Sequence, residues 1–136
     1  PGADVVKLAH EKDIRVVPLV GPSSILMAIM SSGLNGQRFA FNGYLPIDKN
    51  ERKKEIKRLE RLSFEQNQSQ IFIETPYRNN KMLENICATV APDTNVCVAC
   101  DITLPTELIK TLPAKAWAKK NVDLHKRPTI FIIHKS

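Results

Sequence analysis

The chain has 136 residues and a formal net charge of +6 at neutral pH, with an isoelectric point near 9.4. This length suits one compact domain, or one domain with part of another. No apolar run approaches the roughly 20 residues that a membrane-spanning helix needs, and no signal-peptide core follows Pro1-Gly2. We therefore expect a soluble, cytoplasmic piece of a longer protein. The positive charge permits an anionic partner such as RNA, although it identifies none.

The hydrophobic pattern changes its period repeatedly along the chain, which is typical of alternating helices and strands. Helices are predicted over residues 3–11, from Pro22 to Ser32, over Asn50–Leu62, from about Arg78 to Val90, and as a short turn over Pro113–Lys119. Strands are predicted at Arg15–Leu19, from Phe39 to the proline at position 46, and at Gln70–Glu74, Val96–Ala99, Glu107–Leu112 and Thr129–Ile133. Two late strands follow each other without a helix between them, so the pattern favours an α/β domain with a mixed sheet.

The first helix and strand fit poorly into the same domain as the rest. A helix–strand pair at the beginning of a chain usually belongs to a sheet whose other strands precede it. We therefore predict a domain boundary near residue 20. Residues 1–20 would be the remnant of an N-terminal α/β domain, and residues 21–136 a complete C-terminal α/β domain.

The junction Gly21-Pro22-Ser23-Ser24 is the first candidate for a binding site. It joins a predicted strand to a predicted helix, with Pro22 suited to the first helical position and two hydroxyls at the helix N-terminus. Such a junction can hold a small polar ligand. Spacing alone favours the alternative, a helix cap with no ligand, because caps greatly outnumber ligand sites.

A second candidate is the segment Glu74-Thr75-Pro76-Tyr77-Arg78, which follows a buried strand. A carboxylate, a hydroxyl, an aromatic ring and a guanidinium gather there at a strand end, which is where α/β folds bind ligands. The alternative is a structural pair between Glu74 and Arg78. The basic helix over Asn50–Leu62 can likewise contact phosphates or simply face solvent.

The cysteines do not indicate a metal or redox site. Cys97 and Cys100 have CxxC spacing, but on a strand an offset of three places the two sulfurs on opposite faces. No second cysteine pair or nearby histidine completes a ligand set. Reduced core thiols are the interpretation that we adopt, and no metal is expected.

Several segments in one order resemble the tetrapyrrole methylase superfamily. These segments are Gly21-Pro22-Ser23-Ser24, Ser32-Gly33-Leu34, Phe41-Asn42-Gly43-Tyr44-Leu45-Pro46 with Arg52, and Phe72-Ile73-Glu74-Thr75-Pro76-Tyr77-Arg78. Within the superfamily they are most similar to the branch that methylates a ribose 2′-hydroxyl of small-subunit ribosomal RNA. The resemblance covers essentially the whole chain and is strongest over residues 1–82.

This resemblance implies a two-domain methyltransferase, usually a homodimer, that binds S-adenosylmethionine (SAM) in the cleft between its domains. The glycine-rich segment of the family lies in the N-terminal domain and is absent from this sequence. The cofactor-binding residues implied by position are Gly21, Ser23, Ser24, Ile73, Glu74, Pro128 and Thr129, with the last pair beside the adenine. The candidate RNA contacts are Arg52 and Arg78, which belong to the segments above, and Lys53 of the basic helix; no residue is identified as a catalytic base.

Three functions follow as alternatives. The preferred one is the C-terminal part of a SAM-dependent methyltransferase acting on small-subunit rRNA, with the ribosomal RNA or subunit as its partner. The second is methylation of a tetrapyrrole such as a corrinoid or porphyrin. The third is a non-catalytic binding or dimerisation domain.

Overall fold

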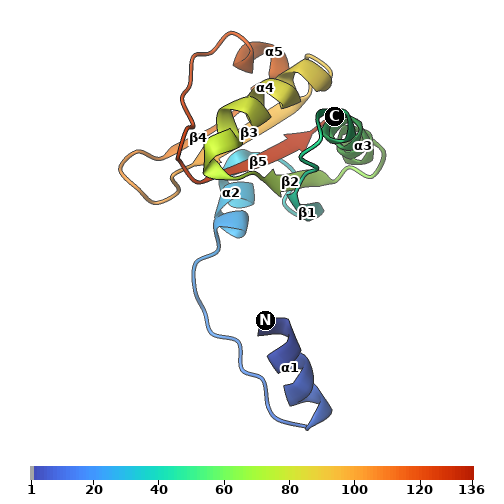
Figure 1. Ribbon diagram of the computed structural model, residues 1–136, viewed down its shortest axis with the longest axis vertical. Helices are drawn as coiled ribbons and strands as arrows, with labels where there is room; N and C mark the ends of the chain where they lie inside the picture. Colours follow the sequence, from blue (N-terminus) through green and yellow to red (C-terminus); the bar gives the residue numbers. More distant parts are fainter. Residues whose placement is uncertain (1) are drawn as a thin grey trace.

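The computed structural model describes residues 2–136 and forms one mixed sheet covered by helices on both faces (Figure 1). The helices are α1 (Gly2–Glu11), α2 (Ser24–Ser32), α3 (Lys49–Glu65), the 3-10 turn η1 (Pro76–Arg78), α4 (Asn79–Thr89) and α5 (Ala114–Trp117). The strands are β1 (Phe39–Tyr44), β2 (Ser69–Ile73), β3 (Asn95–Cys100), β4 (Leu108–Pro113) and β5 (Thr129–His134). No helix within this part of the chain combines the length and apolarity needed to cross a bilayer.

The sheet has five strands in the order β1-β2-β5-β3-β4. β1 and β2 run parallel because α3 crosses over between them, whereas the other neighbouring strands are antiparallel. The short connection from β3 to β4 leaves no room for a crossover helix, so that pair is antiparallel. The predicted mixed α/β sheet is therefore confirmed.

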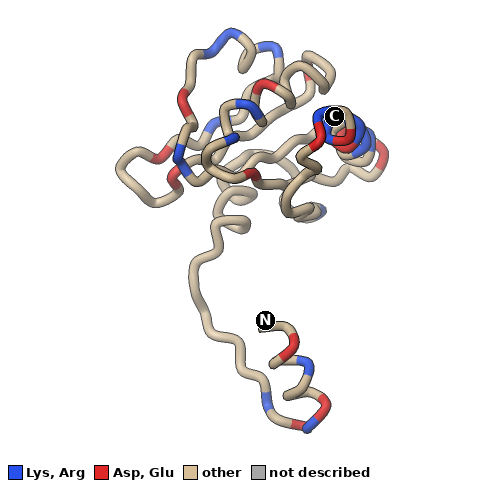
Figure 2. The backbone as a smooth tube through the Cα atoms, viewed as in Figure 1, with Lys and Arg blue, Asp and Glu red and all other residues tan. Residues whose placement is uncertain are grey.

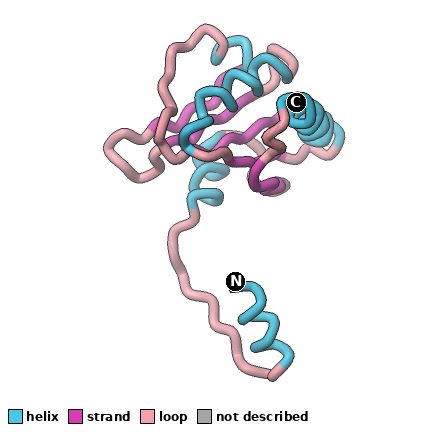
Figure 3. The backbone as a smooth tube through the Cα atoms, in the orientation of Figure 1, coloured by secondary structure: helices cyan, strands magenta, loops and turns pink. Residues whose placement is uncertain are grey.

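The two faces of the sheet are covered unequally (Figures 1 and 3). We call the side covered by α3, α4 and α5 the first face, and the side covered by α2 the second face. Phe72, Phe131 and Ile133 point toward the first face, whereas Ile71 and Ile132 point toward the second. This division follows the alternation of side chains along β2 and β5.

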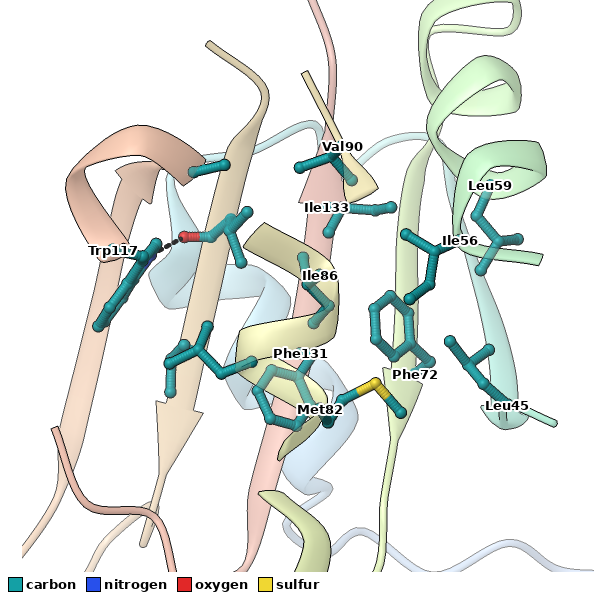
Figure 4. Packing of buried hydrophobic residues seen from close by; sticks show 14 of the residues in the cluster. Leu45, Ile56, Leu59, Phe72, Met82, Ile86, Val90, Trp117, Phe131 and Ile133 are labelled. Atoms are coloured by element: carbon teal, nitrogen blue, oxygen red, sulfur yellow. Dashed lines mark hydrogen bonds between the residues drawn. The ribbon is translucent and has the colours of Figure 1, made fainter. Parts of the chain in front are cut away.

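The core of the first face is built around aromatic side chains (Figure 4). The rings of Phe72 and Phe131 stack at 6.0 Å between centroids, and Met82 from α4 packs in the same cluster. Trp117 from α5 is buried, and its indole Nε1 donates a hydrogen bond to the carbonyl oxygen of Val96 at 2.8 Å. That bond satisfies the one polar atom of the indole, as burial of a tryptophan requires.

The second face has a smaller core. Ala28 and Ile29 of α2 pack against Ile71, Cys97 and Ile132 of the sheet. The hydroxyl of Thr111 donates to the carbonyl oxygen of Ser32 at 2.6 Å and ties the end of α2 to β4. Gly33 follows with φ of 72°, the left-handed conformation that ends the helix as predicted.

The strand predicted at Arg15–Leu19 is not formed, which corrects the sequence analysis. These residues lie in an extended connection between α1 and α2, and Leu19 is 90 % exposed (Figures 1 and 3). A strand needs a neighbouring strand to pair with its backbone, and residues 2–136 offer none to this segment. The helix predicted before it is present as α1, but none of its residues is buried.

The other predicted elements are confirmed with shifts of a few residues at their ends. α3 begins at Lys49, one residue earlier than expected, because Asp48 caps it and accepts bonds from the amides of Asn50 and Glu51. It also continues past the predicted end to Glu65. The helix predicted from about Arg78 begins with the turn η1 and continues as α4. Such tight turns are common at helix N-termini.

Candidate functional site

A cavity of about 430 Å³ opens on the second face, where β2 and β3 end and β5 begins. β2 and β3 both pair antiparallel with β5, so their carboxyl ends meet at the same edge of the sheet. The residues that line the cavity are Ser24, Ile25, Phe41, Ile73, Glu74, Pro76, Ala99, Asp101, Ile102, Leu104, Pro128, Thr129 and Ile130. The wall is mainly apolar with a few hydroxyl and carboxyl groups, a combination typical of small-molecule sites.

The N-terminus of α2 forms one wall of this cavity. Ser23 is the N-cap residue, and its hydroxyl accepts a bond from the amide of Leu26 at 3.4 Å. Ser24 is the first helical residue and borders the cavity. Pro22, predicted at the first helical position, lies before the cap instead, because the hydroxyl of Ser23 takes the capping role.

The end of β2 forms the second wall. Glu74 follows the last residue of the strand and is only 8 % exposed. Its Oε1 accepts a hydrogen bond from the amide of Thr75 at 2.7 Å. The second oxygen, Oε2, has no hydrogen-bond partner among residues 2–136 and so remains available to a ligand. The structural pair considered between Glu74 and Arg78 is not formed.

The third wall carries a carboxylate that the sequence analysis did not single out. Asp101 follows β3, is buried, and binds the guanidinium of Arg127 with 2.8 Å between Oδ2 and Nε. The hydrogen bond from Arg127, then that from Thr106, lowers the pKa of Asp101. The rule that selected Glu74, an acid directly after a buried strand, would also have selected Asp101.

The structure brings together five of the seven predicted cofactor-binding residues. Ser24, Ile73, Glu74, Pro128 and Thr129 all line the cavity, although they come from three separate segments of the sequence. Ser23 lies next to the cavity but uses its hydroxyl as a cap. Gly21 lies in the exposed connection, with no atom within 4 Å of the position that a side chain would occupy. Whether these residues bind a cofactor stays a prediction.

Of the predicted RNA contacts, Arg52 and Lys53 line one shallow hollow beside α4, whereas Arg78 lies outside it. Arg52 is buried, and its guanidinium donates to the carbonyl oxygens of Pro46 at 3.0 Å and Ile47 at 2.6 Å. This arrangement shows that Arg52 holds the turn before α3, and a contact between Arg52 and a phosphate stays a prediction. Lys53 is exposed on α3, where acidic and basic side chains alternate (Figure 2), and Arg78 is exposed at the end of η1.

The cysteine prediction is confirmed in its geometry. Cys97 packs in the core of the second face, whereas Cys100 packs in the core of the first. Their sulfurs therefore cannot share a metal ion. Within residues 2–136 no group of three or more histidine, cysteine or acidic side chains is arranged to hold one.

Comparison with known proteins finds ribosomal RNA methyltransferases among the sequence relatives. No protein-family model matches the chain. Ribosomal RNA small subunit methyltransferase I from Escherichia coli is 31 % identical over 136 residues, which cover 98 % of this chain and 46 % of that protein. The protein of the same name from Vibrio cholerae is 26 % identical with the same two coverages. The chain thus spans about half the length of the curated relatives it matches.

Solved structures share the fold at low sequence identity. The methyltransferase CobJ superposes with a TM-score of 0.54 at 16 % identity, over 90 % of this chain and 51 % of that one. Uroporphyrin-III C-methyltransferase from Thermus thermophilus, complexed with S-adenosylhomocysteine, gives a TM-score of 0.50 at 15 % identity. That match covers 98 % of this chain and 59 % of the other. At this identity the likeness concerns the fold alone.

Proposed function

We propose that the chain belongs to the tetrapyrrole methylase superfamily and that it is the C-terminal part of a SAM-dependent methyltransferase. The proposed acceptor is a ribose 2′-hydroxyl of small-subunit ribosomal RNA, and the proposed location is the cytoplasm. The observation that carries the proposal is the cavity at the ends of β2 and β3. It gathers five residues that the family resemblance had assigned to the cofactor from the sequence alone.

The residues around the cavity suit a nucleoside with charged and hydroxyl groups. Apolar side chains such as Phe41, Ile73 and Ile130 offer a surface for a flat ring. Ser24, Glu74, Asp101 and Thr129 offer hydrogen bonds around it. When bound, S-adenosylmethionine supplies a methyl group on a positively charged sulfur, open to attack by a nucleophile.

The task of these residues is then to hold and align the reactants. Displacement of a methyl group needs the attacking oxygen in line with the breaking bond, and alignment alone can supply roughly 7–11 kcal/mol of the barrier. Glu74 is fixed at one oxygen by the amide of Thr75, so its free oxygen is held in a defined position. We assign Glu74 to cofactor binding or to support of that site, and not to catalysis by proton transfer.

An RNA substrate is supported by an exposed cluster beside the cavity. The ring of Tyr77 is 69 % exposed and meets His125 edge-on at 5.9 Å, with the Nζ of Lys126 5.9 Å from its centre. The amide of Lys126 donates to the carbonyl oxygen of Pro76, a residue of the cavity wall. An open aromatic ring beside basic groups suits a stacked base and its phosphate.

The surface of α3 adds a second basic region. Lys49 and Lys53 lie one turn apart and line a shallow hollow of about 340 Å³ together with Asn85 and Thr89 of α4. Neither lysine forms an ion pair within residues 2–136. Both amines are therefore free to neutralise phosphates, which is the main source of affinity for nucleic acids.

We further propose that residues 1–20 belong to an N-terminal domain and that residues 21–136 form the C-terminal one. Exposed apolar side chains on α1, including Val5 and Leu8, agree with a missing partner surface. The isolated chain should then bind SAM weakly or not at all, because part of the cleft would be absent. A homodimer is also proposed, and light scattering on the full-length protein tests it.

The decisive test of function is methyl transfer by the full-length protein. Labelled SAM is incubated with small ribosomal subunits in one reaction and with a tetrapyrrole precursor in another. The proposal is supported if the label enters the RNA and the RNA backbone resists cleavage at one ribose. Label in the tetrapyrrole moves the assignment to the second function, and label in neither supports a binding or dimerisation domain.

The role of Glu74 is tested by Glu74→Gln in the full-length protein. Loss of the charged acceptor should weaken SAM binding about tenfold, because hydrogen bonds to charged groups contribute roughly 1.5–3 kcal/mol. Calorimetry measures the affinity, and Glu84→Gln on the exposed surface of α4 is the matched control. Unchanged SAM affinity and turnover in Glu74→Gln would show that this role is wrong.

A further inference from the structure

The loop between β3 and β4, residues 101–107, has an unusual backbone conformation. Asp101 has φ of 50° and Thr103 has φ of 72°, in the left-handed region that residues with side chains rarely occupy. The loop is closed by internal bonds, including one from the amide of Thr103 to Glu107 Oε1 at 2.8 Å. Such conformations persist only where surrounding contacts hold them.

Arg127 supplies the contacts that hold this loop. Each of its three guanidinium nitrogens has a different partner. Nε donates to Asp101 Oδ2 at 2.8 Å, Nη1 to the carbonyl oxygen of Asp123 at 2.7 Å, and Nη2 to that of Thr106 at 2.7 Å. One side chain therefore joins both ends of the loop to the segment that precedes β5.

Arg127 is itself fixed through its backbone. Its carbonyl oxygen accepts bonds from Asn79 Nδ2 at 2.6 Å and from the Thr129 hydroxyl at 2.9 Å. The amide of Asp101 also donates to the carbonyl oxygen of Pro128 at 2.9 Å. The guanidinium thus approaches Asp101 from a rigid support, which is how a positioning residue must be built.

The two oxygens of the Asp101 carboxylate are used differently. Oδ2 receives both bonds, from Arg127 and from the hydroxyl of Thr106 at 2.8 Å. Oδ1 has no hydrogen-bond partner among residues 2–136, and it is accessible to solvent. Since Asp101 lines the cavity, a ligand there meets a carboxylate with one oxygen held and the other open.

We propose that Asp101 is a ligand-binding residue whose free oxygen accepts a hydrogen bond from the nucleoside part of the cofactor, and that Arg127 positions it. The nucleoside is the part concerned because the neighbouring wall, Ile102 and Leu104 on the loop and Ile130 on β5, is apolar. A ribose hydroxyl or the amino group of adenine can donate to the oxygen. This inference rests on the proposed SAM site.

The test compares variants of the full-length protein by calorimetry with S-adenosylhomocysteine and with 5′-methylthioadenosine, which lacks the amino-acid part. In Asp101→Asn, the amide oxygen can still accept the bond from Arg127. The amide nitrogen, a donor, then takes the place of the carboxylate oxygen that would accept a bond from the ligand. Binding of both ligands should weaken by the same factor, about tenfold. In Arg127→Lys the positive charge remains but the three-way contact is lost, and a several-fold weakening of both is expected.

Arg58→Lys is the matched control, because Arg58 forms a two-bond pair with Glu55 on α3, away from the cavity residues. It should bind both ligands as the wild type does. The double variant Asp101→Asn/Arg127→Lys should bind about as the weaker single variant, since the two residues act as one unit.

The outcomes separate this inference from the proposed function. A wild-type protein that binds neither ligand contradicts the SAM site itself. Wild-type binding with affinities within twofold in both variants overturns the role of Asp101 and Arg127. Weakening confined to S-adenosylhomocysteine overturns the contact with the nucleoside, and a lowered melting temperature with unchanged affinities shows a purely structural role.

Discussion

The two faces of the sheet are built for different tasks. The first face is closed by α3, α4 and α5, and its core contains the stacked phenylalanines and the buried tryptophan. The second face is covered only by the nine-residue α2, and the cavity opens where this cover ends. The difference shows how a small domain can leave apolar surface open for a ligand: the opposite face supplies most of the buried hydrophobic area.

The largest expected effect tests the first face as the source of stability. Phe72→Ala removes a fully buried ring that stacks on Phe131. The free energy of unfolding should fall by about 3–5 kcal/mol, because the ring leaves a cavity that the surrounding helices cannot fill. Urea denaturation followed by circular dichroism measures the change.

Phe64→Ala is the control for that variant. Phe64 lies on α3 but is 59 % exposed, so its removal should change the free energy of unfolding by less than about 1 kcal/mol. Equal losses in the two variants would contradict the proposed concentration of stability in the first face.

A smaller effect is expected from the cover of the second face. Ser23→Ala removes the side-chain bond to the amide of Leu26 at the start of α2. The free energy of unfolding should fall by about 1 kcal/mol, near the middle of the range for replacement of an N-cap serine by alanine. Amide hydrogen exchange should accelerate in α2 more than in β5, since α2 is tied to the sheet by few contacts.

Ser31→Ala provides a matched control on the same helix. Its hydroxyl bonds to the carbonyl oxygen of Met27 at 2.6 Å within the helix and caps nothing. Exchange in α2 should stay at the wild-type rate. A uniform acceleration across the sheet in Ser23→Ala would mean that α2 and the sheet open together, which would remove the distinction between the faces.

The smallest effect concerns pH. Burial lowers the pKa of His134, whose Nε2 lies 3.0 Å from Asn67 Oδ1. The unfolded chain, with a histidine pKa near 6.5, then binds more protons than the folded one, so stability falls as the pH drops below about 6.5 toward the lower folded value. His134→Gln should flatten this part of the pH profile, whereas His10→Gln on exposed α1 should leave it unchanged.

Much of the fold could be predicted because local signals and tertiary packing agree. The continuous apolar runs within Gln70–Glu74 and Thr129–Ile133 marked β2 and β5 to within one residue at each end. Gly33 marked the end of α2 for a reason that belongs to the residue itself, its freedom at positive φ. The segment Arg15–Leu19 failed because strand formation depends on a partner, which no local pattern can supply.

The site was predictable to the extent that its residues stand at strand ends or match the family motifs. Glu74 and Thr129 were found in this way, and both line the cavity. Asp101 also stands directly after a buried strand and could have been selected in the same way. Arg127 could not, because its contact with Asp101 joins residues 26 positions apart. The structural role of Arg52 could not be predicted, because a sequence shows its charge but not the carbonyl oxygens of Pro46 and Ile47 that it binds.

The strand order has a consequence for how the protein is made. β5 is the last strand in the sequence, yet it lies between β2 and β3 in the middle of the sheet. Until residues 129–134 have left the ribosome, β1-β2 and β3-β4 are two separate pairs with no shared hydrogen bonds. Each exposes edges that can pair with other chains. During synthesis the nascent chain should therefore bind chaperones until its final strand joins the two halves.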